Sequence, residues 1–131
     1  MKNFRNVILD ASSLIAFIYA EEGHNIVTKV LHCSVMSAIN VSEVIKYMIN
    51  CNAQKTEIDS LLDKSLYKIV DFDREQSYLT AELNVQTKKY GLSLADRACI
   101  ALALKTGYPI YTADKVWKNL VIEHVDIYLI R

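Results

Sequence analysis

Two acidic residues end apolar runs that resemble buried strands. Asp10 closes the run NVILD, and Asp114 closes PIYTAD near the other end of the chain. Short apolar runs of this kind are typical of strands buried on both faces of a parallel sheet. Open parallel sheets bind ligands outside the carboxyl ends of their strands. Both carboxylates therefore stand where such a protein would carry out its chemistry.

Two further acids belong to helices that lead away from the same edge. Glu43 lies early in the helical pattern after the apolar run SVMS, and Asp96 lies in the first turn of the helix expected in LSLADRACIALAL. Asp96 shares a helical face with three apolar residues, at spacings of three, four and seven: Cys99, Ile100 and Ala103. We therefore expect Asp96 to point inward and the four carboxylates to meet at one edge of the sheet.

Four converging carboxylates would need compensation. Two carboxylates about 5 Å apart repel by roughly 3 kcal/mol at an effective dielectric constant near 20, whereas a helix dipole stabilises an exposed anion by only about 0.3 to 1 kcal/mol. Protons or a cation must supply the rest, and ligands that are all oxygen suit Mg²⁺ or Mn²⁺ rather than zinc. His24, His32 and His124 are scattered without ligand spacing, which leaves zinc and a histidine base without support.

Each acid also has a structural explanation as a helix cap. Asp10 and Asp114 precede expected helices, where aspartate is a favoured N-cap. The pairs with capping-box spacing are Ser93 with Asp96 and Asn40 with Glu43.

Strands and helices alternate along the chain. The strands are expected at 6–10, 34–37, 66–72, 109–114 and 125–130. The helices are expected at 11–23, 24–33, 39–51, 54–64, 73–90, 92–104 and 116–120, and Gly91 can end the long fifth one. This alternation predicts a three-layer α/β/α sandwich with a mainly parallel central sheet, formed by one domain over residues 1–131.

The composition narrows the classes of function. Fifteen basic residues balance fifteen acidic ones among 131, so no bulk positive field attracts nucleic acid and any polyanion must be held locally. Three cysteines without paired spacing indicate reduced core thiols. The apolar stretch 7–20 is interrupted by polar residues and is shorter than the roughly 20 residues of a membrane span. We expect a soluble cytoplasmic protein without membrane contact.

Four motifs taken together are similar to a known family. ILDASSLIAF, NVSEV, LSLADRACIALAL and PIYTAD occur in this order and span nearly the whole chain. They resemble the PIN-domain ribonucleases, in particular the VapC-type toxins of type II toxin-antitoxin pairs. The acidic quartet of the family falls on Asp10, Glu43, Asp96 and Asp114. Ser12 and Thr112 match the hydroxyl positions that support these acids without binding the metal, although Thr112 also suits a turn or cap. Trp117 stands near the fourth acid where many relatives have phenylalanine.

The resemblance implies a nuclease that depends on Mg²⁺ or Mn²⁺ and cleaves RNA internally. Asp10, Asp96 and Asp114 would be the principal metal ligands, and Glu43 would bind the metal or orient and deprotonate water. Water would be the nucleophile, and the products would carry a 5′-phosphate and a 3′-hydroxyl.

RNA would have to be held by residues near the acids. The candidates for phosphate contact are Lys46, Arg97 and Lys115, each of which also suits a solvated or salt-bridged surface position. Tyrosines that could stack on bases are Tyr19, Tyr47 and Tyr90, although aromatic residues at helical spacing are more often part of a core.

The resemblance also implies protein partners. A VapB-type antitoxin would cover the acids with its tail and bind DNA with its other part, so that the toxin meets DNA only indirectly. A homodimer is expected as well. The helices at 11–20 and 39–51 are apolar enough to serve either contact.

Other functions remain open on the sequence alone. A haloacid-dehalogenase-like enzyme would need a second aspartate where Ser12 stands. A receiver domain could use Asp71 or Asp73 after the third strand, but the lysine expected after the final strand is missing. A PIN-fold binding module without catalysis is the non-enzymatic alternative, and the complete acid set argues against it.

Overall fold

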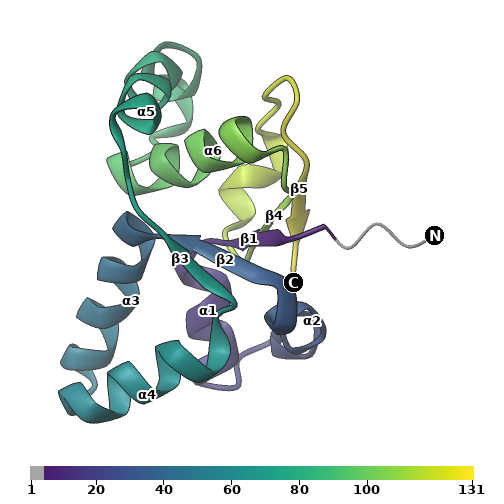
Figure 1. Ribbon diagram of the computed structural model, residues 1–131. Helices are drawn as coiled ribbons and strands as arrows, with labels where there is room; N and C mark the ends of the chain where they lie inside the picture. Colours follow the sequence, from purple (N-terminus) through teal and green to yellow (C-terminus); the bar gives the residue numbers. More distant parts are fainter. Residues whose placement is uncertain (1–4) are drawn as a thin grey trace.

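The computed structural model describes residues 5–131, which form a five-stranded parallel sheet with helices on both faces (Figure 1). The strand order is β3-β2-β1-β4-β5, and every neighbouring pair is parallel. The strands are β1 (Val7–Leu9), β2 (Ser34–Ser37), β3 (Lys68–Val70), β4 (Ile110–Thr112) and β5 (Ile127–Leu129). This sheet confirms the predicted α/β/α sandwich, and it places the ends of β2 and β4 on either side of the end of β1.

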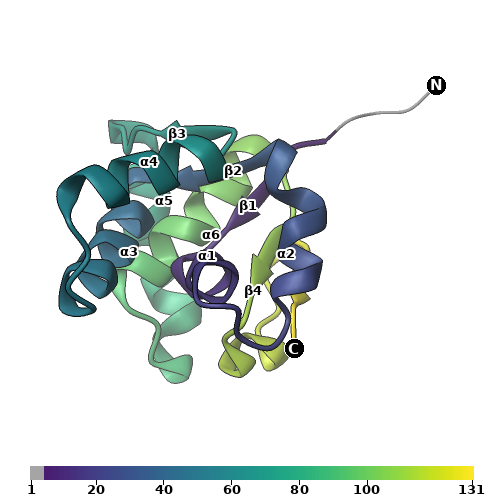
Figure 2. The same cartoon turned by 90° about the horizontal axis from the view of Figure 1, so that it is seen from below.

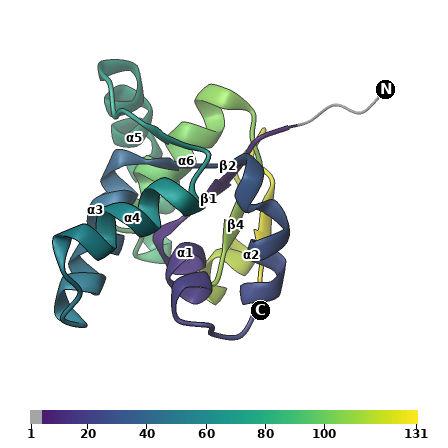
Figure 3. The same cartoon turned by 60° about the horizontal axis from the view of Figure 1, so that its bottom comes forward.

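The helices form two layers. The α-helices are α1 (Ala11–Ile18), α2 (His24–Val30), α3 (Ala38–Asn50), α4 (Lys55–Ser65), α5 (Arg74–Thr87) and α6 (Leu94–Thr106). The 3-10 helices are η1 (Leu31–Cys33), η2 (Lys88–Tyr90) and η3 (Lys115–Asn119). In Figure 1, α5 and α6 lie above the sheet and α1 to α4 lie below it. Seen from below, α1 lies between α2 and α3 (Figures 2 and 3).

Two apolar cores separate these layers from the sheet. Successive residues of a strand point to opposite faces, so Val7 and Leu9 pack with α1 to α4 while Ile8 packs with α6. Both faces of β1 are therefore covered, as its continuous apolar run predicts. None of the helices within residues 5–131 has the length and apolar character that crossing a bilayer requires.

The helix that carries Asp96 is pressed between α5 and the sheet. Its residues Ala98 to Ala103 are all buried, and the three alanines among them allow close approach to neighbouring elements. Gly107 ends the helix in the left-handed conformation. Asp96 occupies the first turn, as predicted, on the side where the helix meets the carboxyl edge of the sheet.

Several predicted boundaries were too wide. The strands are three or four residues long. The predicted helix at 24–33 changes to a 3-10 turn after Val30, and the one at 116–120 is entirely 3-10. Gly91 ends the long helical segment in the left-handed conformation, as predicted.

Gly23 provides a test of how the chain end packs on this fold. Gly23 has φ of 93°, and a Cβ there would lie 2.5 Å from the carbonyl oxygen of Ile130. Gly107 has φ of 78°, but a Cβ there would meet nothing within 4 Å. Gly23→Ala should lower the free energy of unfolding by about 3 kcal/mol, from backbone strain plus overpacking, and Gly107→Ala by about 1 kcal/mol, from strain alone. Equal losses in denaturant titrations would contradict the close contact with Ile130.

Candidate active site

Asp10 is the most deeply buried of the four acids. Its side chain is 5% exposed and caps α1, with Oδ1 accepting hydrogen bonds from the Ser13 backbone N–H at 2.9 Å and the Ser12 hydroxyl at 2.7 Å. Its Oδ2 accepts a hydrogen bond from the Thr112 hydroxyl at 2.5 Å. The capping role is thus confirmed, and the carboxylate is fixed between α1 and β4.

Thr112 connects Asp10 with the acid that follows β4. While its hydroxyl donates to Asp10, its oxygen accepts a hydrogen bond from the Asp114 backbone N–H at 3.0 Å. Ser12 completes the connection, because its oxygen accepts from the Ala113 backbone N–H at 2.9 Å. The two hydroxyl residues expected to support the acids therefore hold the ends of β1 and β4 together.

Asp114 is the N-cap of η3, and Asp96 contributes to the cap of α6 from within its first turn. Asp114 Oδ1 accepts from the Val116 backbone N–H at 3.0 Å, at the start of η3. Asp96 and Ser93 form the predicted capping box, with Asp96 Oδ2 accepting from the Ser93 N–H at 3.0 Å and Ser93 Oγ accepting from the Asp96 N–H at 3.1 Å. Both carboxylates are half-buried, and each keeps a second oxygen that accepts no hydrogen bond from residues 5–131.

Glu43 is held by a residue whose role the sequence did not reveal. The capping-box prediction for Asn40 and Glu43 is wrong, because Ser37 is the N-cap of α3 and both residues lie inside the helix. Asn40 is 1% exposed, and its amide donates to Glu43 Oε1 and to the Ala95 carbonyl oxygen, both at 3.1 Å. It joins α3 to α6 and positions the exposed Glu43 carboxylate. A buried asparagine one turn before an acid is the signal that could have identified this role.

A buried thiol shows that three of the acids surround one region. Cys99 lies on α6 with no exposed surface. Burial raises the pKa of its thiol well above the usual range, and the negative charges of Asp10, Asp96 and Glu43 raise this pKa further. Asp10 at the end of β1, Glu43 on α3 and Asp96 on α6 thus lie near one buried thiol, and Asp114 is linked to Asp10 through Thr112. Within residues 5–131, no three acid, histidine or cysteine side chains are already arranged as a complete ligand set for a metal ion.

The site lacks compensating positive charge. Within residues 5–131, no lysine, arginine or histidine nitrogen lies within 4 Å of any of the four carboxylates. Burial raises the pKa of Asp10 from 3.8 to about 6, even though its hydrogen bonds act in the opposite direction. Asp73 is a useful contrast, because its hydrogen bond with Lys105 lowers the pKa of an aspartate that caps a helix in the same way. The four acids therefore lack the neighbouring cation that Asp73 has.

The basic candidates lie in different surroundings. Lys46 and Lys115 are exposed, and Lys46 lines a hollow of about 330 Å³ that also contains Ser12 and Glu43. Arg97 instead donates to the Thr80 carbonyl oxygen of α5 at 3.0 Å, which gives its guanidinium a structural role. Contact of these residues with RNA stays a prediction.

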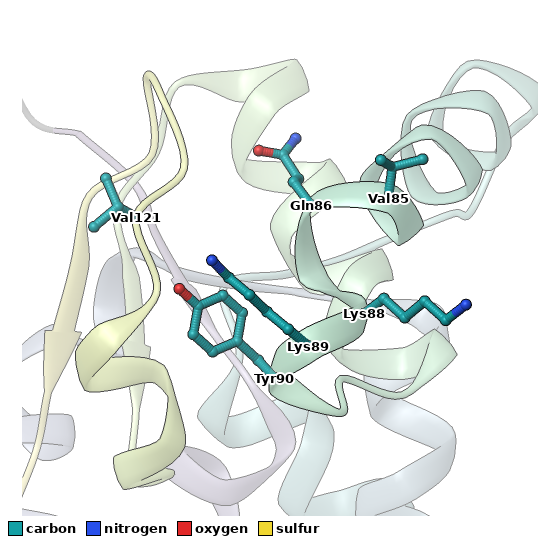
Figure 4. Close-up of a pocket in the computed structure, with 6 residues that line it drawn as sticks. All are labelled: Val85, Gln86, Lys88, Lys89, Tyr90 and Val121. Atoms are coloured by element: carbon teal, nitrogen blue, oxygen red, sulfur yellow. The ribbon is translucent and has the colours of Figure 1, made fainter.

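A hollow larger than the one beside Ser12 and Glu43 lies away from the acids. It measures about 600 Å³ and is lined by the end of α5, by η2 and by Val121. Figure 4 shows Lys89 and Tyr90 on the side facing Val121, with Lys88 directed away. Because none of the four acids lines it, size alone does not identify the functional site of this protein.

Solved structures with a similar fold include members of the VapBC family of toxin-antitoxin systems. VapBC2 from Rickettsia felis, bound to a DNA fragment from its promoter, matches with a TM-score of 0.70 and 17% identity, over 94% of this chain and 97% of the other. DNA-bound VapBC from Salmonella typhimurium matches with a TM-score of 0.70 and 14% identity, over 98% and 100%. FitAcB from Neisseria gonorrhoeae matches with a TM-score of 0.64 and 18% identity, over 93% and 96%. At these identities the likeness concerns the fold.

The sequence itself establishes the family. No curated protein matches it significantly. The PIN domain family matches residues 7–122, a range that contains all four acids and both supporting hydroxyl residues. The receiver and haloacid-dehalogenase interpretations therefore lose their support. The chain belongs to the PIN domain family.

Proposed function

We propose that this protein is a metal-dependent endoribonuclease and the VapC-type toxin of a toxin-antitoxin pair. The observation that carries the proposal is the set of hydrogen bonds that links the acids without a neighbouring cation: Thr112 joins Asp10 to Asp114, and Asn40 joins Glu43 to the first turn of α6, which contains Asp96. Family membership and the fold shared with VapBC structures support the choice of a nuclease toxin over other α/β enzymes.

The donor atoms suit a hard divalent cation. The four acids offer carboxylate oxygens, and burial raises the pKa of the Cys99 thiol, which disfavours the thiolate that a softer metal would need. Mg²⁺ and Mn²⁺ prefer such oxygen ligands. Asn40 Oδ1 is a further buried oxygen without a hydrogen-bond partner within residues 5–131. A bound cation would also relieve the cost of the ionised Asp10.

The residues divide into ligands and positioning groups. Asp10, Asp96 and Asp114 would hold the ion, and Ser12 and Thr112 would keep Asp10 and Asp114 in place. When bound, the ion would lower the pKa of water and neutralise charge on the phosphoryl oxygens. Glu43, exposed and held by Asn40, would bind the ion or would orient water and accept its proton. Water would attack the phosphorus and the bond to the 3′-oxygen would break, leaving a 5′-phosphate and a 3′-hydroxyl.

Two protein partners belong to the proposal. The apolar surface of α3 remains partly open, with Tyr47 40% and Ile49 57% exposed. A hollow of about 310 Å³ between α3 and α4 is lined mostly by apolar residues, among them Ile45 and Ile58. Such surface supports the binding of a VapB-type antitoxin, and of a second copy of the chain, close to the acids. An RNA target places the activity in the cytoplasm.

The direct test is cleavage of RNA with Mg²⁺, with Mn²⁺ and with chelator. We expect wild-type protein to cut only with metal, and Asp96→Asn to lose at least about 100-fold in rate because one ligand charge is gone. Asparagine can still accept the hydrogen bond from the Ser93 N–H, so the cap of α6 is preserved. Asp63→Asn on the exposed face of α4 is the matched control and should cut normally. Cleavage that survives chelation, or an unchanged Asp96→Asn enzyme, would refute the mechanism.

The raised pKa of Asp10 predicts a pH-dependent stability without metal. Folding raises the pKa of Asp10 from 3.8 to about 6. Below both values the carboxyl is protonated in the folded and the unfolded state, so the shift does not change the free energy of unfolding. Above both values the shift lowers the free energy of unfolding by its full amount. The corresponding loss is about 3 kcal/mol between acidic and neutral pH. In chelator, Asp10→Asn should therefore gain about 3 kcal/mol relative to wild type as the pH rises from about 3.5 to about 7.5. Urea titrations at several pH values measure the free energies of unfolding of both proteins. A difference between the two that does not change with pH would contradict the burial of an ionised Asp10.

The toxin assignment has its own test in cells. Induced expression should arrest bacterial growth, and Asp96→Asn at equal abundance should not. Co-expression of the protein encoded beside this gene should relieve the arrest and co-purify with the toxin. If cells that express the protein grow normally although it cleaves RNA in vitro, the nuclease assignment stands and the toxin assignment is refuted.

A further inference from the structure

A second site adjoins the acids along the seam between α1 and α3. The hollow of about 330 Å³ that contains Ser12 and Glu43 continues away from them between the two helices. Its lining residues are Ala11, Ser12, Ile15, Glu43, Lys46, Tyr47 and Asn50. It therefore begins at the candidate catalytic groups and ends at residues that the mechanism above does not use.

The helical periodicity explains why these side chains share one surface. Lys46, Tyr47 and Asn50 follow Glu43 at spacings of three, four and seven, which places all of them on one face of α3. Ser12 and Ile15 are likewise three residues apart on α1. Asn50 is seven residues from Glu43, so the stripe on α3 extends about 10 Å from the acid along the helix axis.

Tyr47 departs from the expectation that these tyrosines belong to the core. Its side chain is 40% exposed, and it contacts Tyr19 edge to face with ring centroids 5.3 Å apart. Such a contact orients the ring without covering it. Tyr47 thus lines the hollow as an oriented aromatic surface rather than as a core residue.

The other groups supply complementary chemistry. Lys46 is an exposed cation beside an acidic site and has no ion-pair partner within residues 5–131. Asn50 is exposed and offers both an amide donor and a carbonyl acceptor. An aromatic ring, a cation and an amide match the base, the phosphate and the base edge of a nucleotide. A purely apolar peptide side chain would use only part of this set.

We propose that this hollow binds an unpaired nucleotide next to the cleaved bond and selects its base. The base would stack on Tyr47, its edge would bond to Asn50, and its phosphate would contact Lys46. This inference rests on the proposed ribonuclease function and deepens it, because it predicts cleavage in single-stranded segments or loops. Unpaired bases in such segments are the ones that proteins stack on aromatic side chains and read by hydrogen bonds.

The test is the base preference around the cleavage site in an RNA hairpin library with a randomised loop. Wild-type protein with Mg²⁺ or Mn²⁺ should show a preference at one position beside the cut. Tyr47→Ala should raise KM by about tenfold or more and weaken this preference, because stacking is lost. Tyr47→Phe should retain both, and Asn50→Ala should reduce the preference with a smaller change in KM.

Matched controls come from α5. Tyr78 and Asn84 are exposed on that helix, and Lys88 lines the separate large hollow, so Tyr78→Ala, Asn84→Ala and Lys88→Ala should keep the wild-type preference and KM. Thermal unfolding of every variant identifies any loss of fold. If Tyr47→Ala unfolds, the exposed Asn50→Ala still decides the matter.

The outcomes separate the two proposals. If wild-type protein cleaves no RNA with either metal, both the proposed function and this inference are refuted. If wild-type protein cleaves but Tyr47→Ala and Asn50→Ala keep its base preference, only the inference fails. That second result is also expected if the hollow receives the tail of a protein partner instead of RNA.

Discussion

The buried carboxylate of Asp10 is the constraint on which the site depends. It ends the central strand, caps α1 and accepts the hydroxyl of Thr112 from β4. A neutral residue could cap a helix at lower cost, because the charge is almost fully buried and its pKa rises to about 6. The hydrogen bonds from Ser12, Ser13 and Thr112 make the ionised form tolerable without neutralising it. An uncompensated charge held this firmly is what a site for a cation requires.

The topology explains how the other acids reach Asp10. Strand β1 lies between β2 and β4, and all three run in the same direction, so their carboxyl ends meet at one edge. Asp114 comes directly from β4, and Glu43 comes from the first turns of the helix after β2. Asp96 reaches the same edge differently. Helix α6 does not directly follow a strand, so the packing of α6 against the sheet determines where Asp96 lies. The alanines of α6 are therefore as necessary to the position of Asp96 as its own cap.

The sequence predicted the parts of this arrangement that depend on local patterns. Apolar runs ending in aspartate located β1 and β4, and the spacing of Ser93 and Asp96 predicted a capping box that the structure contains. The contact of Asn40 with Ala95 joins residues 55 positions apart, and no local pattern encodes such a contact. The exposure of Tyr47 was missed for a related reason. Helical spacing identifies a face of α3, but only the position of α1 decides whether solvent reaches it.

The neutral net charge has a physical consequence for how this site could hold a polyanion. Fifteen basic residues balance fifteen acidic ones, so long-range attraction would contribute little to the proposed binding of RNA. The acids themselves would repel phosphate unless a cation were bound, and Lys46 is the one basic residue that lines the hollow beside them within residues 5–131. Affinity must then come from short-range contacts, of which base stacking is strong and insensitive to net charge. A protein with this charge balance should select its substrate by the shape and identity of an unpaired base rather than by general attraction to phosphate.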